Sequence, residues 1–151
     1  MAANDAIALL KADHKEVSDM FEKFETARST KERLAQHICQ ALTVHAQIEE
    51  EIFYPAAREA LGEDGKDLLD EAKVEHSSLK ELIAAIEGSS PQDDLFDAHV
   101  KVLGEYTKHH VKEEEGELFP KLRKSDMDLK GIGEQLAARK KALMSKMKVA
   151  A

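Results

Sequence analysis

The fold is decided by one stretch of sequence, HAQIEEEIFYP, which runs from His45 to Pro55. It returns as HVKEEEGELFP from His110 to Pro120. In each copy the histidine is followed four residues later by a glutamate, and residues at that spacing lie about one turn apart on one face of a helix. A single pair of this kind usually lies on a solvated helix face. Two copies with the same aromatic-proline ending indicate side chains that point into a helical bundle and can hold a metal.

Apolar residues around this stretch recur at spacings of three and four, which predicts amphipathic helices. The first helix should start near Asn4 or Asp5, because either side chain can cap it. Ser29-Thr30 is expected to open the second helix, with Glu32 completing a capping box. Pro55 lacks a backbone N–H, so we expect a kink or weakened turn just past the glutamates.

Three further helices are expected after this one. Residues 62–65 are interpreted as a turn, followed by a helix over about residues 66–87. The clearest break is the segment 88–91, GSSP, with Pro91 at the first position of a helix that reaches Pro120. Residues 125–128 have the character of a cap for a last helix, which should pack across the others.

Short connections make successive helices antiparallel neighbours. The pattern therefore predicts an all-α fold, an up-down-up-down antiparallel four-helix bundle with an additional C-terminal helix. We expect the bundle over about residues 4–124 and the C-terminal helix over about residues 128–148, within one domain spanning residues 1–151.

The composition excludes several classes of protein. The formal charge of −8 argues against nucleic-acid binding, because phosphate contacts need clustered lysine and arginine. The basic C-terminal helix is interpreted as complementing its own dipole. No apolar run approaches the roughly 18 residues of a membrane span. Cys39 is the one cysteine, which excludes an internal disulfide. The simplest expectation is a cytoplasmic protein without a membrane partner, as a monomer or weak homo-oligomer.

Two more histidines replace apolar residues in the inward stripes, one in the first helix and one in the third. Each helical hairpin therefore supplies two imidazoles and one carboxylate. The candidate metal ligands are His14, His45, Glu49, His76, His110 and Glu114. Two facing carboxylates repel unless a cation lies between them. Two metals bridged by both glutamates, each capped by two histidines, would satisfy the charges; iron suits this set best, with zinc or manganese also compatible.

Residues beside these ligands are candidates for a second ring around the metals, or for ligation. They are Glu50, Glu115, Tyr106 and His109. Tyr106 precedes His110 by four residues and is interpreted either as core filler or as a hydrogen-bond partner close to the metals. His109 has the same spacing to Glu113 as His110 has to Glu114, and the alignment on Pro120 favours His110.

The ordered set His, His-x-x-x-Glu, His, His-x-x-x-Glu resembles the hemerythrin-like proteins of the HHE cation-binding domain family, over about residues 5–124. The resemblance implies a non-haem di-iron centre with the four histidines as terminal ligands. It also implies that Glu49, Glu114 and a solvent-derived oxygen bridge two iron ions. Oxygen-carrying hemerythrins have a second histidine four residues on in the third helix, whereas His76 is followed by Lys80 here.

Relatives with this reduced ligand set are associated with peroxide breakdown, with nitric-oxide or redox responses, and with iron sensing. The favoured expectation is weak catalase-like breakdown of peroxide in oxidative-stress defence. The alternative is reversible binding or sensing of oxygen, nitric oxide or iron, so the ligand is a peroxide or a small diatomic molecule. A purely structural bundle is the third hypothesis, and the repeated His-x-x-x-Glu pair argues against it.

Overall fold

The computed structural model describes residues 5–147, and over that range every regular element is helical. In chain order the elements are α1 (Ala6–Thr26), α2 (Lys31–Ile48), η2 (Glu49–Phe53), α3 (Tyr54–Leu61), α4 (Glu63–Glu87), α5 (Phe96–Glu113), η3 (Glu114–Leu118), α6 (Phe119–Arg123) and α7 (Leu129–Lys146). The elements η2 and η3 are single π-helical turns that join α2 to α3 and α5 to α6.

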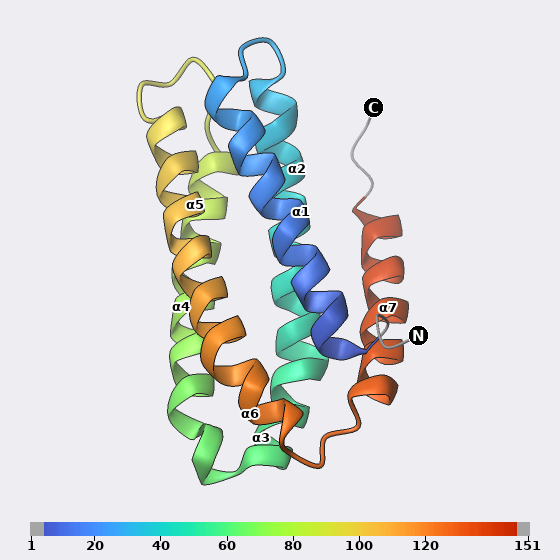
Figure 1. Cartoon of the computed structure of the whole chain (residues 1–151). Coiled ribbons are helices and arrows are strands. Elements are labelled where there is room, and N and C mark those ends of the chain that lie inside the picture. Colours follow the sequence, from blue (N-terminus) through green and yellow to red (C-terminus); the bar gives the residue numbers. More distant parts are fainter. Residues whose placement is uncertain (1–4, 148–151) are drawn as a thin grey trace.

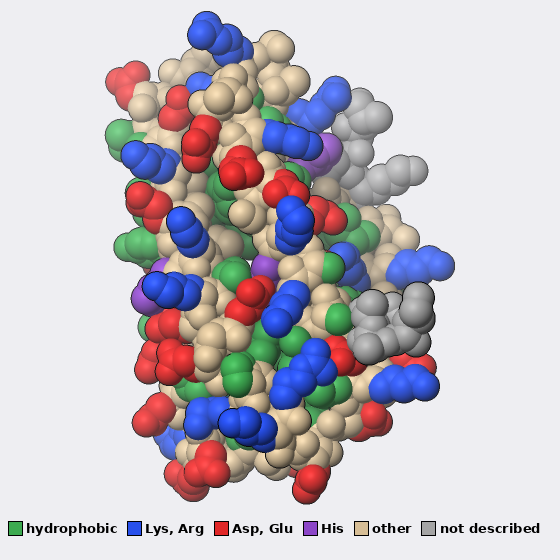
Figure 2. Space-filling model, viewed as in Figure 1, with side chains coloured by type: hydrophobic (Ala, Val, Ile, Leu, Met, Phe, Trp, Pro, Cys, Tyr) green, Lys and Arg blue, Asp and Glu red, His purple; other side chains and the backbone are tan. Residues whose placement is uncertain are grey.

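Two helical hairpins, α1–α2 and α4–α5, form an antiparallel four-helix bundle (Figure 1). The helix α7 packs on the outside of the bundle against α1 and α2. The predicted bundle with an additional C-terminal helix is confirmed. Within the described residues, no helix combines the length and the apolar character that crossing a bilayer requires. The face in Figure 2 carries basic and acidic side chains interspersed over its whole length.

The apolar core is divided into two clusters, one toward each end of the bundle. One cluster includes Leu10, Phe53 and Leu118, and the other includes Phe24 and Leu103. Each fully buried side chain of this kind stabilises the fold by about 1.5–3 kcal/mol. Along α1, α4 and α5 the candidate ligands fall between members of the two clusters, so these buried polar groups have apolar residues on either side.

The helix starts differ in detail from the sequence expectations. Asp5 caps α1 by accepting a hydrogen bond from the Ala8 N–H at 2.8 Å, while Asn4 lies outside the described residues. The expected capping box of the second helix is wrong. Thr30 is the N-cap of α2, but its φ and ψ of −95° and 4° are not the extended values that direct a capping side chain, and its hydroxyl makes no cap hydrogen bond.

The turns before the two helices of the second hairpin also differ from the sequence expectations. Gly62, with φ of +56°, makes the turn before α4 almost alone, so α4 begins at Glu63 and not near residue 66. Pro91 does not open the fourth helix. The Asp93 carboxylate accepts a hydrogen bond from the Ser90 N–H and holds a turn there, and α5 begins only at Phe96.

In both copies of the repeated stretch, the helix widens into a π-helical turn that begins at the candidate bridging glutamate, Glu49 or Glu114. The Tyr54 N–H donates to the Glu49 carbonyl and the Phe119 N–H to the Glu114 carbonyl, five residues back in each case. A proline ring clashes with the carbonyl four residues back in an α-helix, and Pro55 and Pro120 each lie two positions after the last residue of a widened turn. The irregular turn that the prolines predict is therefore present, as a π-helical turn, and such turns often mark functional sites.

Candidate metal centre

The six candidate ligands lie together in the middle of the bundle, and all are buried. They come from six elements, α1, α2, η2, α4, α5 and η3. Glu49 is completely buried and Glu114 is 3% exposed. Carboxylates this deep are unfavourable unless they are paired or bound to a cation, so their partners determine what the site can do.

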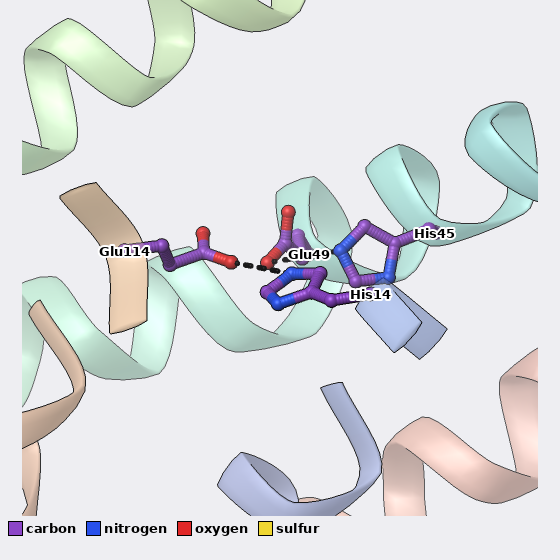
Figure 3. A group of neighbouring side chains, drawn as sticks. All are labelled: His14, His45, Glu49 and Glu114. Atoms are coloured by element: carbon purple, nitrogen blue, oxygen red, sulfur yellow. Dashed lines mark ion pairs between the residues drawn. The ribbon is translucent and has the colours of Figure 1, made fainter. Parts of the chain in front are cut away.

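The first half of the site consists of His14, His45, Glu49 and Glu114, which offer ligand atoms within 4.8 Å of one another (Figure 3). The His14 Nε2 lies 3.1 Å from the Glu114 Oε1, and the His45 Nε2 lies 3.4 Å from the Glu49 Oε2. These contacts lack hydrogen-bonding geometry, and none of the four buried atoms has a hydrogen-bond partner among residues 5–147. Buried polar atoms are rarely left unpaired. Their convergence fits a bound cation.

The second half consists of Glu49, His76 and His110, which also offer ligand atoms within 4.8 Å of one another. The Tyr54 hydroxyl lies between them. It is 3.1 Å from the Glu49 Oε1, 3.3 Å from the Nε2 of each histidine and 2.5 Å from the Glu114 Oε2. Tyr54 was not among the predicted site residues, yet it is buried and its hydroxyl lies among the ligand atoms of this half, where it could join them or hydrogen-bond them.

Each glutamate faces both halves of the site. The Glu49 Oε2 and the Glu114 Oε1 belong to the first half, while the Glu49 Oε1 and the Glu114 Oε2 contact Tyr54 in the second. One oxygen on either side is the arrangement that a bridging carboxylate requires. The two pairs of imidazoles are also alike, because His14 and His45 have the same ring separation of 4.9 Å and the same interplanar angle of 64° as His76 and His110.

Every one of these imidazoles is held at Nδ1 by a carboxylate, and each points its Nε2 into the centre. The Nδ1–carboxylate pairs are His14–Glu115 (2.6 Å), His45–Asp13 (3.0 Å), His76–Glu50 (2.7 Å) and His110–Glu75 (2.5 Å). An Nδ1–H that donates to a carboxylate leaves the Nε2 lone pair free for a metal and fixes the orientation of the ring. The four histidines therefore share one tautomer and one role.

The supporting carboxylates repeat along the chain as the ligands do. Asp13 and Glu75 each directly precede a candidate ligand histidine, and each holds the other histidine of its own hairpin. Glu50 and Glu115 each directly follow a bridging candidate, and each holds a histidine of the opposite hairpin. The two hairpins thus repeat each other, both in the candidate ligands and in the carboxylates that support the ligand histidines.

The imidazoles and carboxylates at the centre shift one another's pKa values. Burial alone would lower the pKa of His45, but the Glu49 carboxylate and the hydrogen bond to Asp13 outweigh it and raise that pKa to about 10. Burial would raise the pKa of Glu49, yet the surrounding imidazoles hold it well below its usual range. Burial, together with the charges of Glu114 and Glu49, raises the pKa of Tyr54 well above its ordinary value.

The two remaining candidates near His110 lie outside the centre. The expectation that Tyr106 faces the bundle interior is wrong, because its side chain is 52% exposed. The buried stripe of α5 runs through Leu103, Thr107 and His110, and an ideal helix turns about 100° per residue. His110 lies at one edge of this stripe, and the position four residues earlier falls beyond that edge. His109 also points outward, with its side chain 67% exposed.

Glu50 and Glu115 lie next to the centre, as predicted. Asp13 and Glu75 also lie there and, like Tyr54, were not predicted from the sequence. A signal for the two acids is present in the sequence, because both stripe histidines follow an acidic residue, in Asp13-His14 and Glu75-His76.

Comparisons with known proteins agree with this geometry. A family model described as hemerythrin HHE cation binding domain matches residues 5–122. A DNA nickase from Nostoc sp. is 31% identical over 118 residues, which make up 76% of this chain and 32% of that protein. An uncharacterised hemerythrin-like protein from Schizosaccharomyces pombe is 26% identical over 114 residues, 74% of this chain and 56% of that protein. The chain thus spans about a third of the length of the DNA nickase and just over half of the length of the Schizosaccharomyces pombe protein.

One solved structure has the same fold. It is the crystal structure of a hemerythrin HHE cation binding domain-containing protein from Mycobacterium kansasii, with a TM-score of 0.79. The match covers 94% of this chain and 88% of that chain at 20% sequence identity. At that identity the similarity concerns the fold.

Proposed function

The chain belongs to the hemerythrin family of HHE cation-binding domains, and from this premise we propose that it binds two iron ions and breaks down peroxide. His14 and His45 would hold one ion, and His76 and His110 the other. Glu49 and Glu114 would bridge the two ions, each with one oxygen toward either half. The family resemblance suggests that a solvent-derived oxygen would also bridge them. The observation that carries the proposal is the set of four buried, converging and unpartnered ligand atoms in the first half.

The donor set suits iron. Imidazole nitrogen with carboxylate oxygen is the ligand mixture typical of non-haem iron, although ligand type alone also admits zinc and manganese. When bound, a pair of iron ions supplies the redox capacity by which one peroxide molecule is oxidised to dioxygen while another is reduced to water. The protein holds the four imidazoles in the required tautomer through their Nδ1–carboxylate hydrogen bonds.

Tyr54 supplies a proton-bearing group at the second half of the site. Its hydroxyl donates to Glu114 and lies within hydrogen-bonding distance of Glu49. It can therefore hold a proton in the second half of the site and donate it to a bound ligand. The buried rings of Phe53 and Phe119 close the adjacent end of the site and keep bulk water away.

The pocket beside the centre favours a small ligand. A pocket of about 10 Å³ touches His110 and Glu114, which is room for about one water molecule. Hydrogen peroxide fits this limit, and so do dioxygen and nitric oxide. Reversible binding or sensing of a diatomic molecule at the same centre is therefore the second candidate function. A reducing compartment such as the cytoplasm would suit ferrous iron and the unpaired Cys39.

Metal content and oxygen evolution test the proposal together. Protein produced in iron-rich medium should carry two iron atoms per chain and release dioxygen from peroxide, and Glu49→Ala should lose both properties. His37→Ala is the matched control, because His37 is exposed and takes no part in the centre. Wild-type protein that binds zinc alone, or no metal, would refute the iron proposal. A long-lived oxygen adduct without peroxide turnover would favour the second candidate.

A further inference from the structure

A third group of metal-ligand side chains lies on the outside of the bundle and takes no part in the proposed centre. Glu75 on α4 and His109 and Glu113 on α5 offer ligand atoms within 4.8 Å of one another. The His109 Nε2 lies 3.4 Å from the Glu113 Oε2 and 3.8 Å from the Glu75 Oε2. Figure 2 shows histidine and acidic side chains exposed at the edge of the molecule where α4 and α5 lie.

This group is connected directly to the buried ligands. Glu75 directs its Oε1 to the His110 Nδ1 at 2.5 Å and its Oε2 to His109. The pocket of about 10 Å³ is lined by Glu75 and Glu113 of the outer group and by His110 and Glu114 of the buried centre, and apolar side chains complete its lining. The outer group and the buried centre therefore share one pocket and one carboxylate.

The internal repeat supplies an independent indication that a cation belongs here. Asp13 is the equivalent of Glu75 in the first hairpin, and its outward oxygen accepts a hydrogen bond from the Lys140 ammonium of α7 at 2.5 Å. The positions equivalent to His109 and Glu113 are Val44 and Ile48, which are buried in the cluster that includes α7.

The Lys140 ammonium thus already supplies a positive charge beside Asp13 in the first hairpin. At the second place, Glu75 makes no ion pair with a lysine or arginine among residues 5–147. Two glutamates and a histidine meet there, and nothing in the described chain neutralises them beyond the imidazoles.

We propose that Glu75, His109 and Glu113 form a surface site for a divalent metal cation, from which the metal enters the buried centre. The entry role rests on the proposed function. An incoming hydrated Fe²⁺ or Mn²⁺ ion exchanges water for the exposed imidazole and the two carboxylates, which are ligands that both ions accept. The ion then moves inward through the pocket that Glu75 and Glu113 share with His110 and Glu114. The first hairpin has no such entrance, because Lys140 and α7 cover the equivalent position.

Loading kinetics and a metal titration test the two parts separately. Metal-free wild-type protein, His109→Ala, Glu113→Gln and the control His37→Ala are mixed with Fe²⁺ under anaerobic conditions, and uptake is followed by rapid mixing. Both cluster variants should take up iron more slowly than wild-type protein, because the incoming ion loses one of its three surface ligands. They should reach the same final iron content, while the control loads at the wild-type rate.

Mn²⁺ titration followed by electron paramagnetic resonance then counts weak sites on protein whose centre is already filled. Wild-type protein should bind one further Mn²⁺ that His109→Ala and Glu113→Gln fail to bind. Equal Mn²⁺ binding by all three proteins would overturn the site, and equal uptake rates would overturn its role in entry. If wild-type protein retained no buried metal, the proposed function would fail, and the loss of Mn²⁺ binding in the variants would still decide the surface site.

Discussion

Tyr54 and Phe119 occupy equivalent positions in the two copies of the repeated stretch, yet only Tyr54 brings a hydroxyl to the centre. Phe119 instead stacks on His14, with the ring centroids 6.1 Å apart and the planes at 3°. The two halves of a site that is otherwise repeated are therefore chemically different. A metal bound beside Tyr54 would have an oxygen group that a metal bound beside His14 would lack.

Replacing Tyr54 tests this difference. Tyr54→Phe should keep two metal ions, because the six His and Glu ligands remain, but it should change the optical spectrum and slow peroxide breakdown. Tyr106→Phe is the matched control, since Tyr106 is exposed and should affect neither. Loss of one metal ion in Tyr54→Phe would show that the phenol is itself an indispensable ligand. An unchanged spectrum and rate would reduce Tyr54 to a packing residue.

The carboxylates behind the histidines should govern metal affinity. Asp13→Asn removes the charge that holds the His45 Nδ1–H while preserving the shape of the side chain. We expect affinity for the metals to fall roughly 10- to 100-fold, as for other residues that orient metal-bound histidines. Competition with a chelator measures the change. Glu16→Gln, an exposed position on the same helix, serves as the control, and equal affinities would contradict a supporting role for Asp13.

Metal binding should depend on pH because it displaces protons. In metal-free protein the pKa of His45 is raised to about 10 from an ordinary 6.5, so its Nε2 carries a proton at neutral pH and must release it to a metal. The Glu49 carboxylate, with its lowered pKa, is already ionised and releases none. Affinity should therefore rise with pH from about 6.5 toward 10. Calorimetry in buffers of different ionisation enthalpy would detect the released protons, and a buffer-independent heat would contradict the prediction.

The same pKa sets how metal-free protein responds to alkali. Because the raised pKa of His45 reflects favourable pairing in the folded state, the stability it contributes is complete below about pH 6.5 and is lost as the pH rises through about 10. The metal takes over this pairing in loaded protein. The difference in Tm between the loaded and metal-free forms should widen between pH 6.5 and 9, as measured by scanning calorimetry. A Tm difference that stays constant with pH would show that groups other than His45 control the stability of the metal-free protein in alkali.

Removing the metals should destabilise the fold at neutral pH as well. A ligand present at a thousand times its Kd stabilises the native state by about 4 kcal/mol. Metal-free protein should accordingly melt at a clearly lower temperature, although the imidazole–carboxylate pairs and the two apolar clusters keep it folded. Adding iron back should restore the original Tm, and failure to do so would point to irreversible loss of the site.

How much of this site the sequence predicts depends on which contacts are local. His45 and Glu49 lie on one helix at a fixed spacing, so their repetition at His110 and Glu114 identifies them without coordinates. The Asp13–His45 and Glu75–His110 contacts join different helices. They depend on the rotation and crossing of those helices, which no local pattern specifies. Tyr106 was misplaced for a related reason, because a four-residue spacing from His110 does not show on which side of that residue the core lies.

The π-helical turns make the site sensitive to the exact number of residues that each turn contains. Each turn, Glu49–Phe53 and Glu114–Leu118, contains one residue more than an α-helical turn would. Deleting a single residue there would restore an α-helix and rotate all that follows by about 100° relative to the ligands. Tyr54 or Phe119 would swing away from the centre, and each proline would meet a carbonyl that the wider turn now avoids. Substitutions on the outer side of these turns should therefore be tolerated far better than deletions, and relatives that keep the site should align through them without gaps.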